Sequence, residues 1–160
     1  MNDKVLIIMR GIPGSGKSHR AKILGEGGAV FSTDEFFTQG GKYNFGPAKI
    51  AVAHAWNQNR VRDALAKGVT PIVVDNTNIM LAHVKPYLEM ARSYGYKIEY
   101  AEPDSPWWKS FGPNMSKQDE DKLVKALMQK GTHEVPEAAV RKMLSQWEHD
   151  LPDKAKAEGF

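Results

Sequence analysis

The residues best suited to chemistry form a glycine-rich segment near the N-terminus, Gly11-Ile-Pro-Gly-Ser-Gly-Lys-Ser18. The segment matches the pattern G-x-x-x-x-G-K-[ST] at every fixed position. In such loops the glycines let successive N–H groups turn toward phosphate oxygens, and the helix that follows adds the positive end of its dipole. Lys17 provides a cation for the β- and γ-phosphates, and the Ser18 hydroxyl is placed to hold Mg²⁺. The segment therefore predicts a site for a magnesium–nucleoside triphosphate.

The surroundings of this segment favour a nucleotide site over a glycine-rich turn with an incidental lysine. The apolar run over 4–10 predicts a buried strand before it, and a helix is expected to begin near Lys17. A strand before and a helix after are the context in which this loop binds phosphate. We expect the nucleotide to contact Gly11, Ile12, Pro13, Gly14, Ser15, Gly16, Lys17, Ser18 and His19.

A carboxylate ends the third apolar run of the chain, Pro71-Ile-Val-Val-Asp75. Ligands of open α/β sheets bind outside the carboxyl ends of the strands, where an Asp can hold Mg²⁺ directly or through water. The alternative is an Asp that opens a turn or caps the next helix, although Asn76, Thr77 or Asn78 could do that instead. We predict that Ser18 and Asp75 form the metal site.

A second carboxylate, Asp34, follows the second apolar run in Ser32-Thr-Asp-Glu-Phe-Phe37. Transfer of a phosphoryl group to a hydroxyl needs a carboxylate that orients the acceptor and takes its proton. The alternative is an acid in the first turn of a helix, since Thr33-Asp34-Glu35 also resembles a helix start. Spacing alone leaves both roles open.

These candidates require strands that end at a common edge and helices between them. Short apolar runs predict strands over 4–10, 29–32, 71–75 and 96–101, with helices from about 17, over 47–68 and over 78–95. Alternating strands and helices indicate a parallel sheet with right-handed crossovers. Apolar stripes are expected at Val52, Trp56, Val61 and Leu65 of the second helix and at Leu81, Val84, Leu88 and Ala91 of the third, which Pro86 should kink or restart.

After 103 the pattern becomes helical without strands. Ser116 opens a capping box for a helix to about Lys130, which Gly131 stops. A last helix begins at about Pro136 and carries an apolar stripe, and the residues from Asp153 onward predict a solvated tail.

Composition limits the class of protein. The chain has 160 residues, of which 41% are hydrophobic and 26% charged, and this suits one globular domain. The absence of Cys excludes disulfides and thiolate chemistry and agrees with a cytoplasmic location. The longest apolar run, Val5–Met9, is too short to span a membrane. A net charge of +3 permits a polyanionic partner without requiring one.

Taken together, these segments resemble the polynucleotide-kinase branch of the P-loop kinases, in particular small kinase-like relatives of the NEDD4-binding polynucleotide kinase domain. The resemblance is carried in chain order by Gly11–Ser18, Ser32–Phe37, Ala53–Asn57, Val74–Asn78, Lys85–Tyr87, Ala101–Pro103, Val135-Pro136 and Trp147-Glu148. The pair S-T-D-x-x-F and V-D-N-T-N is more specific than the phosphate loop.

The resemblance implies a kinase that moves the γ-phosphate of ATP to a hydroxyl, typically a nucleic-acid 5′-hydroxyl, with Mg²⁺ as cofactor. It implies that Asp34 is the general base and that Asp75 belongs to the metal and phosphate site. We expect an α/β fold, the three-layer α/β/α P-loop NTPase fold, with a mainly parallel sheet in the order 2-3-1-4. A single domain should cover 1–150, with a helical lid at about 106–135 and a tail over 151–160.

Two departures from the resembled family concern the acceptor and the lid. Phe37 stands where phage polynucleotide kinases have a substrate-binding Arg. The lid motif R-N-x-H-G-V-P is replaced by Lys130-Gly-Thr-His-Glu-Val-Pro136. Lys130 then takes the catalytic place of the lid Arg, unless Lys122, Lys125 or Arg141 does, and a Lys offers one point charge where Arg offers a planar fork. The residues expected near the acceptor are Asp34, Asn76, Asn78 and Arg141.

Several other side chains have two interpretations. Trp56 is expected in the core, whereas His54 and Asn57 could line an acceptor groove or form a structural pair. Trp107 and Trp108 could stack on nucleobases, but packing under the lid is favoured.

Three functions remain open on this basis. The first is a polynucleotide 5′-hydroxyl kinase. The second is a small-molecule kinase for a nucleoside, nucleotide or sugar, which would have a closed pocket in place of an open basic channel. The third is a non-catalytic nucleotide-binding module, against which the intact Lys17, Ser18, Asp34 and Asp75 argue.

Overall fold

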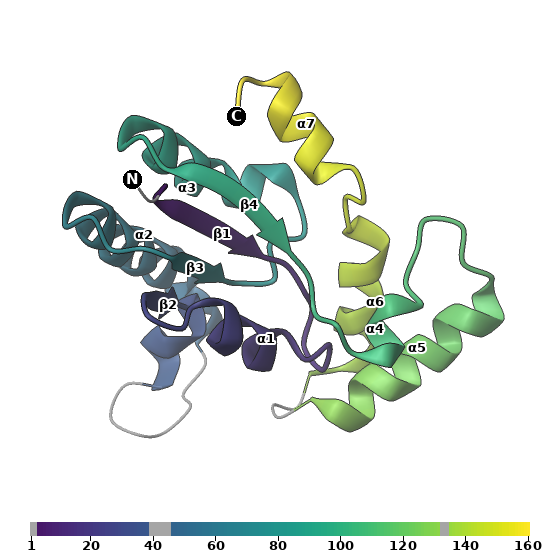
Figure 1. Ribbon diagram of the computed structural model, residues 1–160. Helices are drawn as coiled ribbons and strands as arrows, with labels where there is room; N and C mark the ends of the chain where they lie inside the picture. The colour runs from purple at the N-terminus through teal and green to yellow at the C-terminus, as the bar shows by residue number, and fades with distance from the viewer. Residues whose placement is uncertain (1–2, 39–45, 132–134) are drawn as a thin grey trace.

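The computed structural model contains a four-stranded sheet in the order β2-β3-β1-β4, as expected, and every pairing is parallel (Figure 1). The structure describes residues 3–38, 46–131 and 135–160. The strands are β1 Val5–Met9, β2 Ala29–Phe31, β3 Ile72–Asp75 and β4 Lys97–Ala101.

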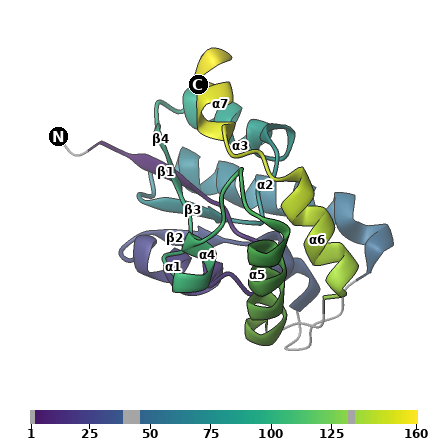
Figure 2. The ribbon, with the colours of Figure 1, turned by 90° about the vertical axis from the view of Figure 1, so that its right-hand side faces the viewer.

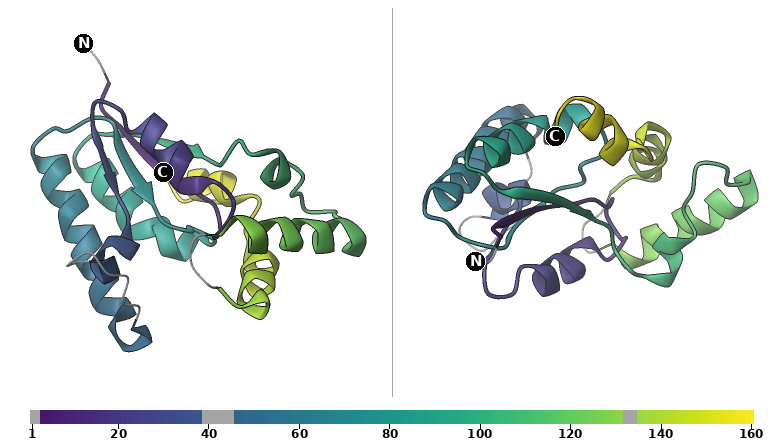
Figure 3. Two further views of the ribbon diagram at one scale, coloured as in Figure 1. Left: turned by 90° about the horizontal axis from the view of Figure 1, so that it is seen from below. Right: turned by 45° about the horizontal axis from the view of Figure 1, so that its top comes forward.

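Helices cover both faces of the sheet, which confirms the three-layer α/β/α arrangement (Figure 3, right). On one face α1, Lys17–Leu24, packs against side chains that alternate along β1, including Ile7 and Met9. The opposite side chains of β1, Leu6 and Ile8, belong to a larger core. That core is completed by α2 Ile50–Ala66, α3 Leu81–Ser93 and α7 Leu151–Ala157.

The strand register places the proposed chemistry at one edge of the sheet. Met9 at the end of β1 lies opposite Asp75 of β3 and Ala101 of β4, and Phe31 of β2 lies opposite Val74. All four strands therefore end at nearly the same level. The loops that leave this edge are those in which parallel α/β folds hold their ligands.

Beyond this edge lies a helical subdomain formed by the short helix α4 Pro106–Lys109, by α5 Lys117–Lys130 and by α6 Glu137–Gln146 (Figure 2). The expected cap of α5 is confirmed, because the Ser116 hydroxyl accepts a hydrogen bond from the Asp119 N–H at 3.1 Å. A second core, which we call the lid core, joins these helices; its members include Trp108, Leu123, Leu127, Leu144 and Trp147. Part of the stretch aligned with the lid motif, residues 132–134, lies outside the described residues.

The second helix differs from expectation in its start and in its buried stripe. A 3₁₀ turn over Pro47–Lys49 precedes α2, and Val52 is 57% exposed. Val61 and Leu65 are buried as predicted and Trp56 is half-buried, and the other buried positions are Ala53, Asn57 and Ala64. A polar Asn in the buried row obscured this stripe in the sequence, because Asn57 is buried through hydrogen bonds and not through an apolar surface. The stripe expected on α3 is confirmed, and the helix is continuous across Pro86.

The expectation of a solvated C-terminal tail is wrong. Residues Leu151–Ala157 form α7, and the side chains of Leu151 and Ala155 are fully buried against the core beside α3. Lys85 of α3 forms an ion pair with Glu158 at 2.7 Å. Two apolar residues one turn apart, among so many charged neighbours, are too few to indicate a buried helix from the sequence.

None of the helices in the described part of the chain is both long and apolar enough to cross a membrane.

We predict that Leu151→Ala lowers the free energy of unfolding by about 3 kcal/mol, because the substitution removes buried methyl groups and leaves a cavity. Val52→Ala is the matched control and should change it by less than about 0.5 kcal/mol, since Val52 is on the surface. Urea unfolding monitored by circular dichroism measures both. Equal stability of the two variants would show that α7 does not contribute to the core.

Candidate active site

The loop Gly11–Ser18 connects β1 to α1 and has the backbone shape of a phosphate cradle. Gly14 and Gly16 adopt φ values of +86° and +91°, which side-chain-bearing residues rarely tolerate. A Cβ atom at Gly14 would also collide with the carbonyl oxygen of Leu127 in α5. The sequence therefore needs glycine there for two reasons, the loop conformation and the close approach of the lid.

The N-terminus of α1 is suited to an anion. Its N-cap residue, Gly16, provides no side-chain cap, and the first turn carries no acidic residue. Ser18 and His19 in this turn are both exposed. Uncapped N–H groups and the helix dipole attract phosphate, so the residues present fit the triphosphate predicted from the sequence.

The base of the loop is anchored on both sides. Ile12 is completely buried in the lid core, and the Gly11 N–H donates to the Thr77 carbonyl at 3.2 Å. Ser15 is fully buried, and its hydroxyl has no hydrogen-bond partner among the described residues. Packing and hydrogen bonds thus fix the framework of the loop, in which Gly11, Ile12 and Ser15 are buried.

Lys17 and Asp75 meet directly at the edge of the sheet. The Lys17 Nζ lies 2.6 Å from Asp75 Oδ1 and 3.4 Å from the Asp75 carbonyl oxygen. Asp75 is buried at the end of β3, so the pair compensates a charge that would otherwise be costly to bury. The structure thus brings together the predicted phosphate-binding cation and the predicted metal-binding carboxylate.

Asp34 lies on the next strand end, in the 3₁₀ helix Thr33–Thr38 that follows β2. The Asp34 carboxylate is exposed, and the described residues contribute no ion pair to it. Its backbone is held in place because the Ser32 hydroxyl accepts from the Asp34 N–H at 3.3 Å and Asn76 Oδ1 accepts from the Thr33 N–H at 2.9 Å. Asn76 thereby ties the Asp34 turn to the end of β3.

The neighbouring acid, Glu35, is engaged elsewhere. Its Oε1 accepts from the Ser32 N–H at 2.9 Å and from Arg60 Nη2 at 2.8 Å. Arg60 also donates to Asn57 Oδ1 at 3.0 Å, and its guanidinium lies 4.0 Å from the ring centroid of Trp56. No pattern in the sequence indicates the ion pair between Arg60 and Glu35, because Glu35 comes from a part of the chain far from α2.

A buried polar network continues beneath this turn. Asn57 Nδ2 donates to the Tyr87 hydroxyl at 3.1 Å, and burial raises the pKa of Tyr87. Asn57 therefore has a structural role, which is one of the two predicted for it. Its partners are Tyr87 and Arg60, whereas His54 is exposed on α2. The network packs the Asp34 turn against α2 and α3.

Asn78 faces the protein interior. It is 2% exposed, has a φ of +48°, and donates through Nδ2 to the carbonyl oxygens of Met9 at 2.7 Å and Val74 at 3.3 Å. It therefore joins the ends of β1 and β3. The side chain of this predicted acceptor residue is thus engaged by backbone carbonyls in the interior.

The predicted lid cations differ in their surroundings. Arg141 on α6 forms ion pairs with Glu120, Asp121 and Glu137 at 3.8, 2.9 and 3.1 Å. Lys130, the last residue of α5, is exposed, and its Nζ lies 5.2 Å from the ring centroid of Trp107. Lys130 is thus associated with the phosphate-loop side of the lid, and Arg141 with a cluster of acids.

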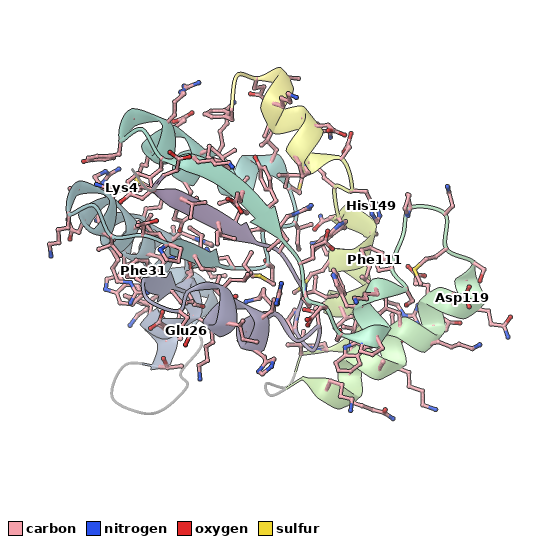
Figure 4. All side chains as sticks on the ribbon, viewed as in Figure 1. Lys4, Glu26, Phe31, Phe111, Asp119 and His149 are labelled. Atoms are coloured by element: carbon pink, nitrogen blue, oxygen red, sulfur yellow. The ribbon has the colours of Figure 1, made fainter. Side chains whose placement is uncertain are left out.

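Trp107 and Trp108 pack within the lid, which is the favoured interpretation. Trp108 is buried in the lid core, 5.0 Å from the ring centroid of Trp147. Phe111 and His149, which Figure 4 labels, lie beside this cluster with ring centroids 4.8 Å apart. Partial burial lowers the pKa of His149.

Comparison with known proteins places this site in context. A family model described as an AAA domain matches residues 6–149. NEDD4-binding protein 2 of Homo sapiens is 37% identical over 147 residues, which are 90% of this chain and 8% of that protein. The 2′,3′-cyclic-nucleotide 3′-phosphodiesterase of Mus musculus is 30% identical over 113 residues, 65% of this chain and 25% of that protein. The chain therefore spans less than a third of either relative.

Solved structures share the fold. A chain of the Pnkp1/Rnl/Hen1 RNA repair complex superposes with a TM-score of 0.61 at 23% identity, over 91% of this chain and 44% of that chain. A candidate kinase from Chloroflexus aurantiacus superposes with a TM-score of 0.54 at 16% identity, over 81% of this chain and 68% of that one.

We predict that Lys17→Met abolishes most of the thermal stabilisation by Mg–ATP. At about one hundred times Kd, the nucleotide should stabilise the wild-type chain by about 2.7 kcal/mol, which is about 5 to 10 °C for a chain of this size. Each variant is compared with its own ligand-free melting temperature, because loss of Lys17 also leaves Asp75 without its partner. Lys22→Met, exposed on the same helix, should keep the full shift, and an unchanged shift in Lys17→Met would contradict the site.

Proposed function

Because the chain belongs to the AAA-domain family and its expected resemblance to the relatives of the NEDD4-binding protein is confirmed, we propose that it is an ATP- and Mg²⁺-dependent phosphotransferase. Its proposed acceptor is a nucleic-acid 5′-hydroxyl. One observation carries the proposal: Asp75, which is paired with Lys17 of the phosphate loop, ends β3, and the exposed Asp34 follows the neighbouring strand β2.

The proposed nucleotide site consists of the loop and the first turn of α1. The residues that would hold Mg²⁺ are Ser18 and Asp75, and the ion supplies charge neutralisation on the phosphate oxygens when bound. Lys17 belongs to the phosphate loop, and its ammonium also contacts Asp75. It can therefore serve both the phosphate groups and the carboxylate proposed to hold Mg²⁺. We propose that it neutralises the charge that develops on the transferred phosphoryl group.

The proposed role of Asp34 is that of the general base. As the acceptor oxygen bonds to the γ-phosphorus, its proton passes to the Asp34 carboxylate, and the bond from the γ-phosphorus to the bridging oxygen breaks to release ADP. One contrast supports this assignment over Glu35. Glu35 is held by Arg60 and the Ser32 N–H, whereas the described residues leave the Asp34 carboxylate without an ion pair.

Three observations bear on the chemical class of the phosphate acceptor. The net charge of +3 and the likeness to a chain of an RNA repair complex favour a nucleic acid. A small-molecule acceptor is the second candidate, because Phe37, which is 6% exposed, occupies the place of the substrate-binding Arg of the phage enzymes. A buried ring cannot contact the backbone phosphate of a strand.

We predict that Asp34→Asn reduces phosphoryl transfer by about 10²- to 10⁴-fold, because the amide cannot accept the proton. ATP affinity, measured by calorimetry, should stay within a few-fold. Glu35→Gln is the matched control, and its transfer rate should remain within about tenfold of wild type. Undiminished transfer by Asp34→Asn would remove the base from the proposed mechanism.

The acceptor is identified by incubating the protein with γ-labelled ATP and a panel of 5′-hydroxyl DNA, 5′-hydroxyl RNA, nucleosides, nucleotides and sugars. We expect label on an oligonucleotide, at a rate that falls steeply between 50 and 200 mM salt as phosphate contacts are screened. Label on nucleosides or sugars alone would favour the small-molecule kinase. Absence of label on every member would favour the non-catalytic nucleotide-binding module.

A further inference from the structure

Trp107 connects the phosphate loop to the lid through two different parts of its side chain. Its indole Nε1–H donates to the carbonyl oxygen of Gly14 at 2.8 Å. Over its ring lies the Nζ of Lys130, 5.2 Å from the ring centroid. Neither contact has a role in the phosphoryl transfer proposed for Lys17, Asp34 and Asp75. A single side chain therefore contacts both the cradle and the cation expected to act from the lid.

The hydrogen bond from Trp107 is one of a pair that fixes the loop from behind. The Ser105 hydroxyl donates to the neighbouring Ser15 carbonyl at 2.8 Å. In a planar trans peptide the C=O and the following N–H point in opposite directions. Fixing these two carbonyls therefore directs the N–H groups of Ser15 and Gly16 away from α4, and the Ser15 N–H indeed donates to Ile12 O at 3.1 Å.

External anchors matter here because the loop is intrinsically pliable. Gly14 has no Cβ, so its own sterics restrict φ and ψ only weakly. Its conformation in the protein, with φ at +86°, is maintained by neighbours, among which are Leu127 of α5 and the Trp107 indole. Loss of the indole N–H would leave the Gly14 carbonyl without this partner and the cradle less ordered.

The ring of Trp107 provides a place for the lid cation. The separation of 5.2 Å lies within the range in which an ammonium is attracted to the face of an indole. Lys130 is also the last residue of α5, where the helix dipole favours a cation. Arg141 is not placed to act from the lid in the same way, because three carboxylates form ion pairs with its guanidinium.

We propose that Trp107 is a positioning residue that orders the phosphate loop through its indole N–H and holds Lys130 beside that loop through its ring. The first half concerns nucleotide binding and requires only the loop, whereas the second half rests on the proposed function. The two halves predict different kinetic effects, because the N–H acts on nucleotide affinity and the ring acts on the rate of transfer.

The first half is tested with Trp107→Phe, which keeps an aromatic face and removes the N–H donor. The affinity for Mg–ADP, measured by calorimetry, should fall about three- to tenfold. Trp108→Phe is the matched control, because the Trp108 indole donates to Glu102 Oε1 at 2.9 Å and not to the loop. Its affinity should remain within about twofold of wild type, even if its melting temperature falls. Equal affinities of Trp107→Phe and wild type would overturn the role of the N–H.

The second half is tested by transfer to the acceptor that the labelled panel identifies, at saturating ATP. Trp107→Leu and Lys130→Gln should each lower kcat by about tenfold or more, whereas Trp107→Phe should change mainly the KM for ATP. The double variant should be no slower than the slower single variant, since both changes disrupt one contact. Additive losses, or a wild-type kcat in Trp107→Leu, would overturn the role of the ring. If the wild-type protein labels no acceptor, the proposed function fails, while the Mg–ADP comparison still decides whether Trp107 orders the loop.

Discussion

The site depends on one buried cation, Arg10, which directly precedes the phosphate loop. Its guanidinium is 2% exposed and donates to the carbonyl oxygens of Asn78, Ile79 and Glu148 at 2.8, 3.0 and 2.8 Å. It also lies 4.2 Å from the ring centroid of Trp147. Burial lowers the pKa of Arg10 to about 10, against the opposing effect of Glu102 and Glu148, so the side chain stays charged at neutral pH. The end of β1, the loop after β3 and the end of the lid core are thus held by a single planar group with several donors.

This constraint explains why a short motif near the N-terminus acts together with residues far along the chain. Glu148 receives the Arg10 bond at its carbonyl oxygen and accepts the N–H of Leu81 through Oε1 at 2.7 Å. The start of α3 and the end of α6 are therefore fixed relative to β1. Because the loop begins at the next residue, Gly11, its base is held close to these same elements.

Local patterns predicted much of the fold and the phosphate site, but not the partners of long polar side chains. The capped helix α5, the stripe of α3 and the loop follow from spacing rules that involve neighbouring residues, whereas the strand order was expected from the family resemblance. Arg10 and Arg60 could not be placed in this way, because their partners are backbone carbonyls and side chains brought near by the whole fold. The sequence left two roles open for Asn57 and predicted a tail in place of helix α7, for related reasons. One is a polar residue in the core, and the other presents only two apolar side chains among charges.

A lysine and an arginine differ in how a lid can orient their charge. An arginine in the lid would orient itself through several fixed donors, whereas the ammonium of a lysine has no preferred plane and a flexible stem. Lys130 therefore needs a neighbour that restricts where its charge lies, and the face of Trp107 offers an attraction that requires no particular donor direction. The same indole donates to Gly14 O, so one side chain contacts both Lys130 and the phosphate loop. Lys130 stands where the resembled family has a lid arginine, and the role proposed for Trp107 would supply part of the orientation that a lysine lacks.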